Sequence, residues 1–195
     1  MPRAIPLTRG ESALVDDSDY DWLRQWRWLL VGPGYAGRFD RLDGTSRLIY
    51  MHRLLINAQP GQHVDHINGD RLDNRRANLR LVTNTQNQQN KRTPSHNTSG
   101  HKGVCWHKGS GKWHVRITVN GKRLHLGYTR DRETAARLYD AAARRFFGEY
   151  ARLNYPDSPT SPRIAGLLAD ILARHAVTRL PVPSTPLQCR RTAHE

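Results

Sequence analysis

Alternating polar and apolar residues mark two neighbouring strands in the middle of the chain. In residues 113–119 (WHVRITV) every second side chain is apolar, which is the pattern of a strand with one buried face. Asn120-Gly121 follows, the dipeptide most typical of a two-residue hairpin loop, and residues 122–127 (KRLHLG) return. Counting from that loop predicts this register: Val119 opposite Lys122, Ile117 opposite Leu124 and Val115 opposite Leu126.

The same register gathers the polar residues of both strands on one face. Arg116 lies opposite His125 and Thr118 opposite Arg123, with His114 further along. This segregation predicts a sheet with one basic, solvent-exposed face and one apolar, buried face.

A helix should cover the apolar face. Asp131 is a good N-cap and Gly148 a good C-cap for a segment whose apolar residues recur at helical spacing. With a further strand over residues 103–106, we predict a three-stranded antiparallel sheet packed on one helix.

Upstream, residues 63–90 predict the order strand, turn-rich loop, strand, helix. The strands are residues 63–67 and 79–82, with Asn68-Gly69 as a turn. Thr83 with Gln86 forms a capping box, so a helix should start near Asn84.

Residues 1–62 predict small antiparallel strands and one helical piece. Residues 21–30 contain three tryptophans, and Trp22 and Trp26 would share one helix face as core residues. A second short helix is expected over residues 51–55.

The fold class is therefore α+β, and the chain divides at its polar, proline-rich joints. The expected segments are 1–62, a β-rich prelude; 63–92, a small strand-strand-helix core; 93–100, a linker; 101–156, the sheet-and-helix domain; and 157–195, a tail with a short helix over 163–176 and disorder from Pro181.

Basic residues are concentrated in one part of the chain. The net charge is +14, and residues 96–155 contribute +8 of it, with no acidic residue between His96 and Arg130. Clustering of this kind favours a polyanionic partner over mere solubility.

Two cysteines are too few for a disulfide framework, which favours a reducing cytoplasm. No segment predicts a membrane span.

The loop region also carries candidate hydrolytic chemistry. Hydrolysis of a phosphodiester needs an activated water and a cation. His66 could accept the proton, while the Asp65 carboxylate and the Asn87 amide suit a hard ion such as Mg²⁺. His52 and His63 are alternative bases.

This segment resembles the HNH nucleases of phages and introns, through Asp65-His66-Ile67-Asn68-Gly69, Asn74, Asn78-Leu79-Arg80, Val82-Thr83 and Asn87. The resemblance implies a ββα-metal fold for the core. It also implies that Asp65 and Asn87 bind one divalent cation, Mg²⁺ or Mn²⁺, that His66 is the general base, and that Asn78 braces the loop. Four arginines around that loop are expected to contact phosphates: Arg71, Arg75, Arg76 and Arg80.

The following domain resembles the Apetala-two/ethylene-response-factor DNA-binding domain, through Lys102-Gly103-Val104, Gly111-Lys112-Trp113, Leu126-Gly127, Glu133-Thr134-Ala135-Ala136, Tyr139-Asp140, Phe147-Gly148 and Leu153-Asn154-Tyr155-Pro156. Together with the alternation, it predicts these DNA contacts: Lys102, Cys105, His107, Lys108, Lys112, His114, Arg116, Thr118, Arg123 and His125. Four of them, at 105, 107, 116 and 125, differ from the plant residues, so the plant target sequence does not carry over.

We therefore expect a monomeric, metal-dependent DNA endonuclease of the homing type, guided by its sheet domain. It would act on double-stranded DNA in a bacterial or phage-infected cell, with no membrane and no small-molecule cofactor. The alternatives are a DNA-binding regulator with a decayed nuclease domain and a general phage HNH nuclease. RNA binding is possible on charge alone, but a groove-reading sheet fits duplex DNA better.

Overall fold

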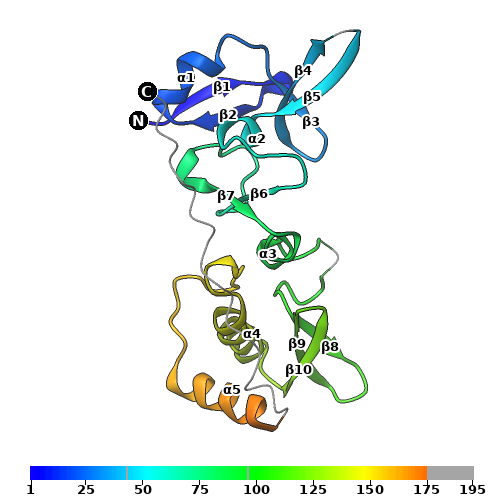
Figure 1. Ribbon diagram of the computed structural model, residues 1–195. Helices are drawn as coiled ribbons and strands as arrows, with labels where there is room; N and C mark the ends of the chain where they lie inside the picture. Colours follow the sequence, from blue (N-terminus) through cyan, green and yellow to red (C-terminus); the bar gives the residue numbers. More distant parts are fainter. Residues whose placement is uncertain (43, 96, 175–195) are drawn as a thin grey trace. The chain divides into compact units, whose positions relative to one another are not determined.

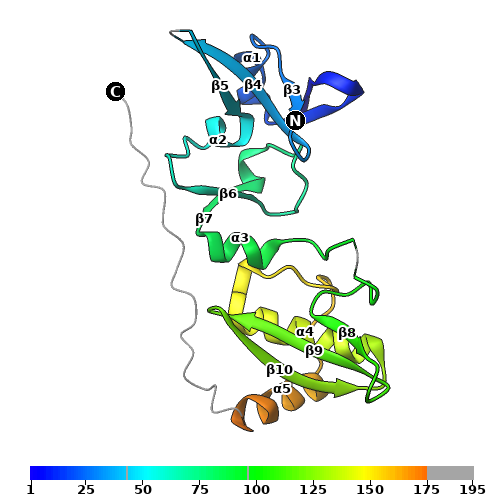
Figure 2. The ribbon, with the colours of Figure 1, turned by 90° about the vertical axis from the view of Figure 1, so that its right-hand side faces the viewer.

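The computed structural model describes residues 1–42, 44–95 and 97–174, and the chain divides into two units between Gln88 and Gln89. Figures 1 and 2 show the course of each unit. The boundary falls near the end of the predicted strand-strand-helix core.

The first unit consists of small antiparallel sheets and short helices. Its strands are β1 (Arg3–Pro6), β2 (Ser12–Val15), β3 (Leu29–Val31), β4 (Tyr35–Leu42), β5 (Thr45–Tyr50), β6 (His63–His66) and β7 (Leu79–Val82). They form the sheets β1-β2, β3-β4-β5 and β6-β7. The helices are α1 (Asp17–Leu23) and α2 (Met51–Leu55), with 3-10 turns at Thr8–Gly10 and Arg76–Asn78, and α3 (Asn84–Asn90) starts in this unit and contains the boundary. The expected β-rich character of residues 1–62 is thus observed.

The tryptophan-rich segment differs from the prediction. Helix α1 starts before it and ends at Leu23, so Trp26 follows the helix instead of sharing a face with Trp22. Trp28 is 2% exposed, and its indole N–H donates to the Leu23 carbonyl at 2.9 Å, whereas Trp22 remains 38% exposed. Burial of the large Trp28 ring requires the chain to turn back under the helix end, and this outweighs the helical spacing.

The strand-loop-strand-helix order is observed. Strands β6 and β7 pair with His63 opposite Val82 and His66 opposite Leu79. At the start of α3, the Thr83 backbone N–H donates to Gln86 Oε1 at 2.8 Å and the Gln86 N–H donates to Thr83 Oγ1 at 3.3 Å. These reciprocal bonds are the predicted capping box.

In the second unit a three-stranded sheet packs on a long helix. Its strands are β8 (Val104–His107), β9 (Lys112–Val119) and β10 (Lys122–Thr129), in the order β10-β9-β8. Helix α4 (Arg132–Phe147) lies across one face, as Figure 2 shows. Asp131 caps it by accepting the Thr134 N–H at 2.6 Å, and Gly148 ends it at a positive φ of 54°.

The hairpin register departs from the prediction at one point. The pairs formed by Thr118 with Arg123 and Arg116 with His125 are as expected, but Val115 lies opposite Gly127 instead of Leu126. A β-bulge inserts Leu126 as an extra residue, and its side chain is 1% exposed in the core.

Part of the predicted tail belongs to this domain. Helix α5 (Pro162–Arg174) packs against α4, and its buried side chains join the core around the sheet: Ile164, Leu168, Ile171 and Leu172. The short helix predicted within the tail is thus observed, but it packs into the domain core, because its apolar stripe must be buried. The expected disorder from Pro181 and the last residues of the predicted helix lie outside the described residues.

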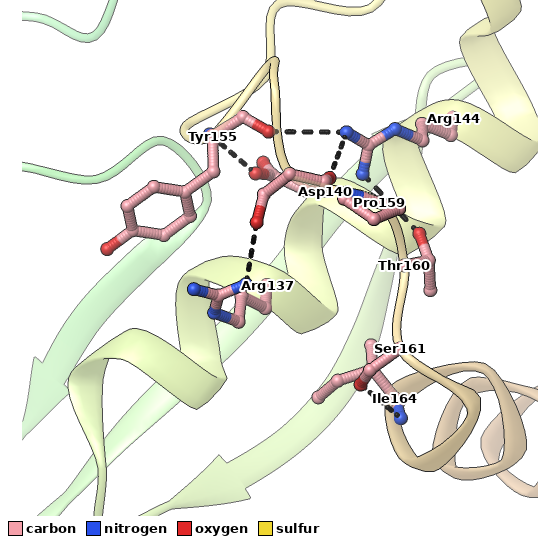
Figure 3. Close-up of a pocket in the computed structure, with 9 residues that line it drawn as sticks. Arg137, Asp140, Arg144, Tyr155, Pro159, Thr160, Ser161 and Ile164 are labelled. Carbon is pink, nitrogen blue, oxygen red and sulfur yellow. Dashed lines mark hydrogen bonds between the residues drawn. The ribbon is translucent and has the colours of Figure 1, made fainter.

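Asp140 on α4 fastens the chain that leads to α5. Its carboxylate, 1% exposed as a residue, accepts the backbone N–H groups of Asn154 and Tyr155, both at 2.8 Å. Figure 3 shows Arg144 beside it, donating to the Tyr155 carbonyl, a bond of 3.2 Å. Arg144 also donates to the Ser158 carbonyl at 2.7 Å. The cavity lined by these residues has a volume of about 10 Å³, room for one water. The hydrogen bonds of Asp140 and Arg144 therefore have a structural role.

Residues of the predicted linker also fold onto the second unit. Ser99 is 1% exposed, and its hydroxyl donates to the Val104 carbonyl at 2.7 Å. The Asn97 side chain accepts the N–H groups of Ser99 and Gly100, both at 2.9 Å.

Within the described residues, the helices are too short or too polar to cross a membrane.

Candidate nuclease site and DNA-binding face

His66, the last residue of β6, is buried beside Asn74. Its Nε2 lies 3.4 Å from Asn74 Oδ1, and the two residues are 5% and 1% exposed. The Asn74 amide is itself oriented, because its Nδ2 donates to the Leu72 carbonyl at 3.1 Å. Since an amide oxygen only accepts, this contact places the proton of neutral His66 on Nε2 and the lone pair on Nδ1.

Aromatic rings surround His66 on one side. The ring centroids of His52 and Tyr35 lie 5.2 and 6.0 Å from that of His66, and Tyr50 lies 5.4 Å from His52. Burial lowers the pKa of His66 despite the opposing hydrogen bond of Asn74 and the nearby Asp65. His66 is therefore neutral at neutral pH, the state that a general base requires.

His52 is a buried histidine of the same cluster. It is 8% exposed, and its Nδ1 is buried with no hydrogen-bond partner. Burial, together with the charges of His66 and Arg53, lowers its pKa to about 3. His63, the other alternative base, starts β6 and is exposed.

Asp65 forms an ion pair across the β6-β7 hairpin. Its Oδ2 accepts Arg80 Nε at 3.0 Å and Nη2 at 2.8 Å, and both side chains are largely buried. Because Asp65 pairs with Arg80 and His66 with Leu79, the two neighbours point to opposite faces of the strand.

Asn78 closes the loop between the two strands. Its Oδ1 accepts the Asn68 backbone N–H at 3.0 Å, and its Nδ2 donates to the Asp73 carbonyl at 2.7 Å. The buried Asp73 carboxylate in turn accepts Asn68 Nδ2 at 2.8 Å, and its bonds to Arg75 hold its pKa below the usual value. The loop that follows His66 is therefore fixed from within.

Asn87 lies half-buried in the first turn of α3, where its N–H donates to the Thr83 carbonyl at 3.0 Å. A carboxylate and an amide oxygen are hard donors, so the Asp65 and Asn87 pair suits Mg²⁺ or Mn²⁺ with water as the remaining ligands. The described residues contain no group of three or more His, Cys, Asp or Glu side chains that could hold a metal ion.

The four loop arginines all have partners within the protein. Arg71 donates to the Pro33 carbonyl and lies 5.0 Å from the Tyr35 ring, and Arg75 pairs with Asp73 at 2.7 Å. Arg76 binds both oxygens of Asp19 at 2.7 and 2.8 Å and the Leu55 carbonyl at 2.6 Å. Arg80 is likewise bound to Asp65. The bonds of these four guanidinium groups therefore stabilise the loop and its surroundings.

The second unit presents the expected polar sheet face. Arg116, Thr118 and Arg123 are exposed on it. His114 Nε2 and His125 Nδ1 share a hydrogen bond of 2.7 Å, and Cys105 Sγ lies 3.8 Å from His114 Nδ1. Burial and then the neighbouring His125 lower the pKa of His114.

The lysines expected to contact DNA differ in their surroundings. Lys108 is exposed and Lys112 is half-buried. Lys102 donates to the carbonyls of Gln89 and Lys91, and burial lowers its pKa to about 8. Its ammonium is therefore engaged with the protein backbone.

Several site residues were not predicted. Asn74 was quoted in the resemblance without a role. Tyr35 and Tyr50 were not considered, because separation in sequence hides the approach of Tyr35 to His66 and of both tyrosines to His52. Tyr128 joins His114 and His125 on the sheet face. A signal for Tyr128 existed in Gly127, since an isolated glycine in a strand often marks a bulge.

Comparison with known proteins agrees with the first half of this picture. A family described as HNH endonuclease matches residues 50–89. The chain is 39% identical to protein 3.8 of Escherichia phage T7 over 93 residues, 47% of this chain and 75% of that protein. It is 29% identical over 151 residues to an uncharacterized HNH endonuclease, L560, of Acanthamoeba polyphaga mimivirus, 76% of this chain and 78% of that protein.

Plant proteins match a smaller part. The chain is 34% identical over 67 residues to the AP2-like ethylene-responsive transcription factor TOE2 of Arabidopsis thaliana, 34% of this chain and 14% of that protein. The likeness is thus partial, and the identity of the second unit as such a domain stays a proposal. The chain belongs to the family of phage T7 protein 3.8 and carries an HNH endonuclease domain.

Proposed function

We propose that the protein is a divalent-metal-dependent DNA endonuclease of the homing type, guided to its site by the sheet of the second unit. The observation that carries the proposal is the His66–Asn74 contact inside a segment that matches HNH endonucleases. A buried, neutral imidazole held in one tautomer by an oriented amide is arranged as a general base.

In this mechanism His66 Nδ1 takes a proton from the attacking water. Asn74 Oδ1 accepts a hydrogen bond from His66 Nε2–H throughout and so stabilises the resulting imidazolium. The Asp65 carboxylate, oriented by Arg80, and the Asn87 amide would hold the cation, Mg²⁺ or Mn²⁺. Because Asp65 and His66 point to opposite faces of β6, their action on one phosphate requires the chain to bend where the strand ends at His66. When bound, such an ion offsets charge on the scissile phosphate and the leaving oxygen. Asn78 keeps the loop after His66 in place. The family resemblance implies a 3′-hydroxyl and a 5′-phosphate as products.

The second unit supplies target recognition in this proposal. Its exposed Arg116 and Arg123, with Lys108 and the histidines, suit base edges and phosphates in a major groove. The partial likeness to plant transcription factors supports this role. The arginines of the HNH loop act chiefly by holding the loop and its carboxylates.

Supercoiled plasmids carrying diverse inserts test the nuclease directly. With Mg²⁺ or Mn²⁺ the wild-type chain should nick or linearise them, EDTA should stop cleavage, and His66→Ala should lower the rate by at least about 10²-fold, the usual contribution of a general base. His63→Ala is the matched control, because that histidine is exposed at the start of the same strand.

Equal cleavage by His66→Ala would reject the assigned base. A wild-type chain that binds duplex DNA but leaves every plasmid intact would favour the regulator with a decayed nuclease domain.

A further inference from the structure

A β-bulge decides which face of the second sheet carries Tyr128. Continued alternation from Leu124 and Leu126 would place Tyr128 among the buried apolar residues. Instead the extra residue at Leu126 shifts the register, and Gly127 takes a φ of 120° that favours glycine. Tyr128 consequently lies opposite His114, on the polar face. Bulges commonly re-aim a side chain near a functional surface.

The Tyr128 ring is supported by imidazoles on that face. It stacks on His114 with 5.0 Å between centroids and 25° between planes. The centroids of His125 and His107 lie 4.8 and 5.2 Å away. Tyr128 nevertheless remains 46% exposed. The ring is therefore held in place on one side and open to a partner on the other, so little side-chain entropy is lost on binding.

The surroundings of this ring suit DNA. Arg116 and Arg123 are exposed on the same face, and residues 97–130 contain no acidic side chain. A rigid, partly exposed tyrosine ring on a face that also carries arginines is typical of residues that contribute most to an interface. In a major groove, an apolar surface is complementary to the methyl group of thymine.

Resting on the proposed function of the sheet, we infer that Tyr128 contacts DNA and determines part of the sequence bound. Its ring lies against a base edge, where contact with a thymine methyl favours an A·T pair. The plant-domain resemblance assigned no DNA contact to position 128. The assignment follows from the bulge and from the histidines that support the ring.

The test uses the full chain with a chelator, so that DNA is bound but not cut. One duplex is chosen from those that the wild type enriches from a random library, and a second duplex is unrelated. Tyr128→Ala should bind the enriched duplex at least about tenfold more weakly, with little change on the unrelated one. Tyr128→Phe, which keeps the ring, should bind nearly as well as the wild type.

Salt dependence separates the ring from the charges. Tyr128→Ala removes no cation, so the slope of log affinity against log salt should stay at the wild-type value. Arg116→Ala should reduce its magnitude by about one if that arginine contacts a phosphate. Trp106→Ala is the matched control, since Trp106 is also 46% exposed but pairs with Trp113 on the opposite face. It should leave affinity unchanged.

The outcomes distinguish this inference from the function on which it rests. If Arg116→Ala and Arg123→Ala weaken binding while Tyr128→Ala does not, the role of Tyr128 is rejected and the sheet face stands. If all three bind like the wild type, the sheet face is rejected as well. Equal losses on both duplexes with a lower melting temperature would make Tyr128 structural, and an equal loss in Tyr128→Phe would reject the ring contact.

Discussion

At the scale of single residues, the HNH unit depends on buried polar groups that orient one another. Asn74 is held by the Leu72 carbonyl and faces His66, while Asn78 and Asp73 fix the turn at Asn68. Buried groups of this kind are costly when a partner is removed. The precision of the candidate site therefore comes from amides and carboxylates that do not themselves react.

His52 makes the stability of the first unit sensitive to acid. In the unfolded chain its pKa is near the ordinary histidine value of 6.5, whereas burial lowers it to about 3 in the folded protein. Between these values the unfolded state binds the additional proton. The free energy of unfolding should therefore fall as pH is lowered from 6.5 towards 3, by up to about 1.4 kcal/mol per pH unit.

Denaturant titrations of the full chain at several pH values between 6.5 and 4.5 measure this slope. His52→Phe keeps an aromatic ring without a titrating nitrogen and should show a smaller slope. A slope equal to that of the wild type would mean that His52 is not the group responsible.

At the scale of elements, short local signals located the strands and helices more reliably than their faces. The Asn120-Gly121 loop, the Thr83 capping box and the Asp131 cap could all be predicted, because each depends on a few adjacent residues. The bulge at Leu126 was not predicted, because Leu124 and Leu126 continue the apolar alternation and the signal from Gly127 was outweighed by it. The end of α1 was also hidden, because burial of Trp28 involves distant residues.

The capping box of α3 gives a prediction at this scale. Thr83→Ala removes the hydroxyl that accepts the Gln86 N–H, so the free energy of unfolding should fall by about 1 kcal/mol. Because α3 carries Asn87, plasmid cleavage should slow as well. Thermal unfolding and cleavage rates check both effects, with Thr83→Ser as the control that keeps the bond. Unchanged stability in Thr83→Ala would show that the box is dispensable.

At the scale of the whole molecule, sequence alone indicated a division of labour but not the assembly of either site. The motif residues of the HNH segment lie close together in the chain and were found there. The rings in the cluster of His66 and His52 come from β4, β5 and α2, and only folding brings them together. The charge distribution pointed to the second unit. In the first unit, three of the four arginines predicted to contact phosphates, Arg75, Arg76 and Arg80, are paired with aspartates.

On the proposed DNA-binding face, the lowered pKa of His114, which is hydrogen-bonded to His125, predicts that docking of a duplex is coupled to proton uptake. Burial and nearby cations lower the pKa of His114, and phosphates brought close to it would raise that pKa again. Calorimetric binding heats should therefore differ between buffers of unlike ionisation enthalpy, and affinity should increase as pH falls towards 6.5 and below. His114→Gln should bind with heats independent of the buffer, and the same buffer dependence in that variant would point to another group.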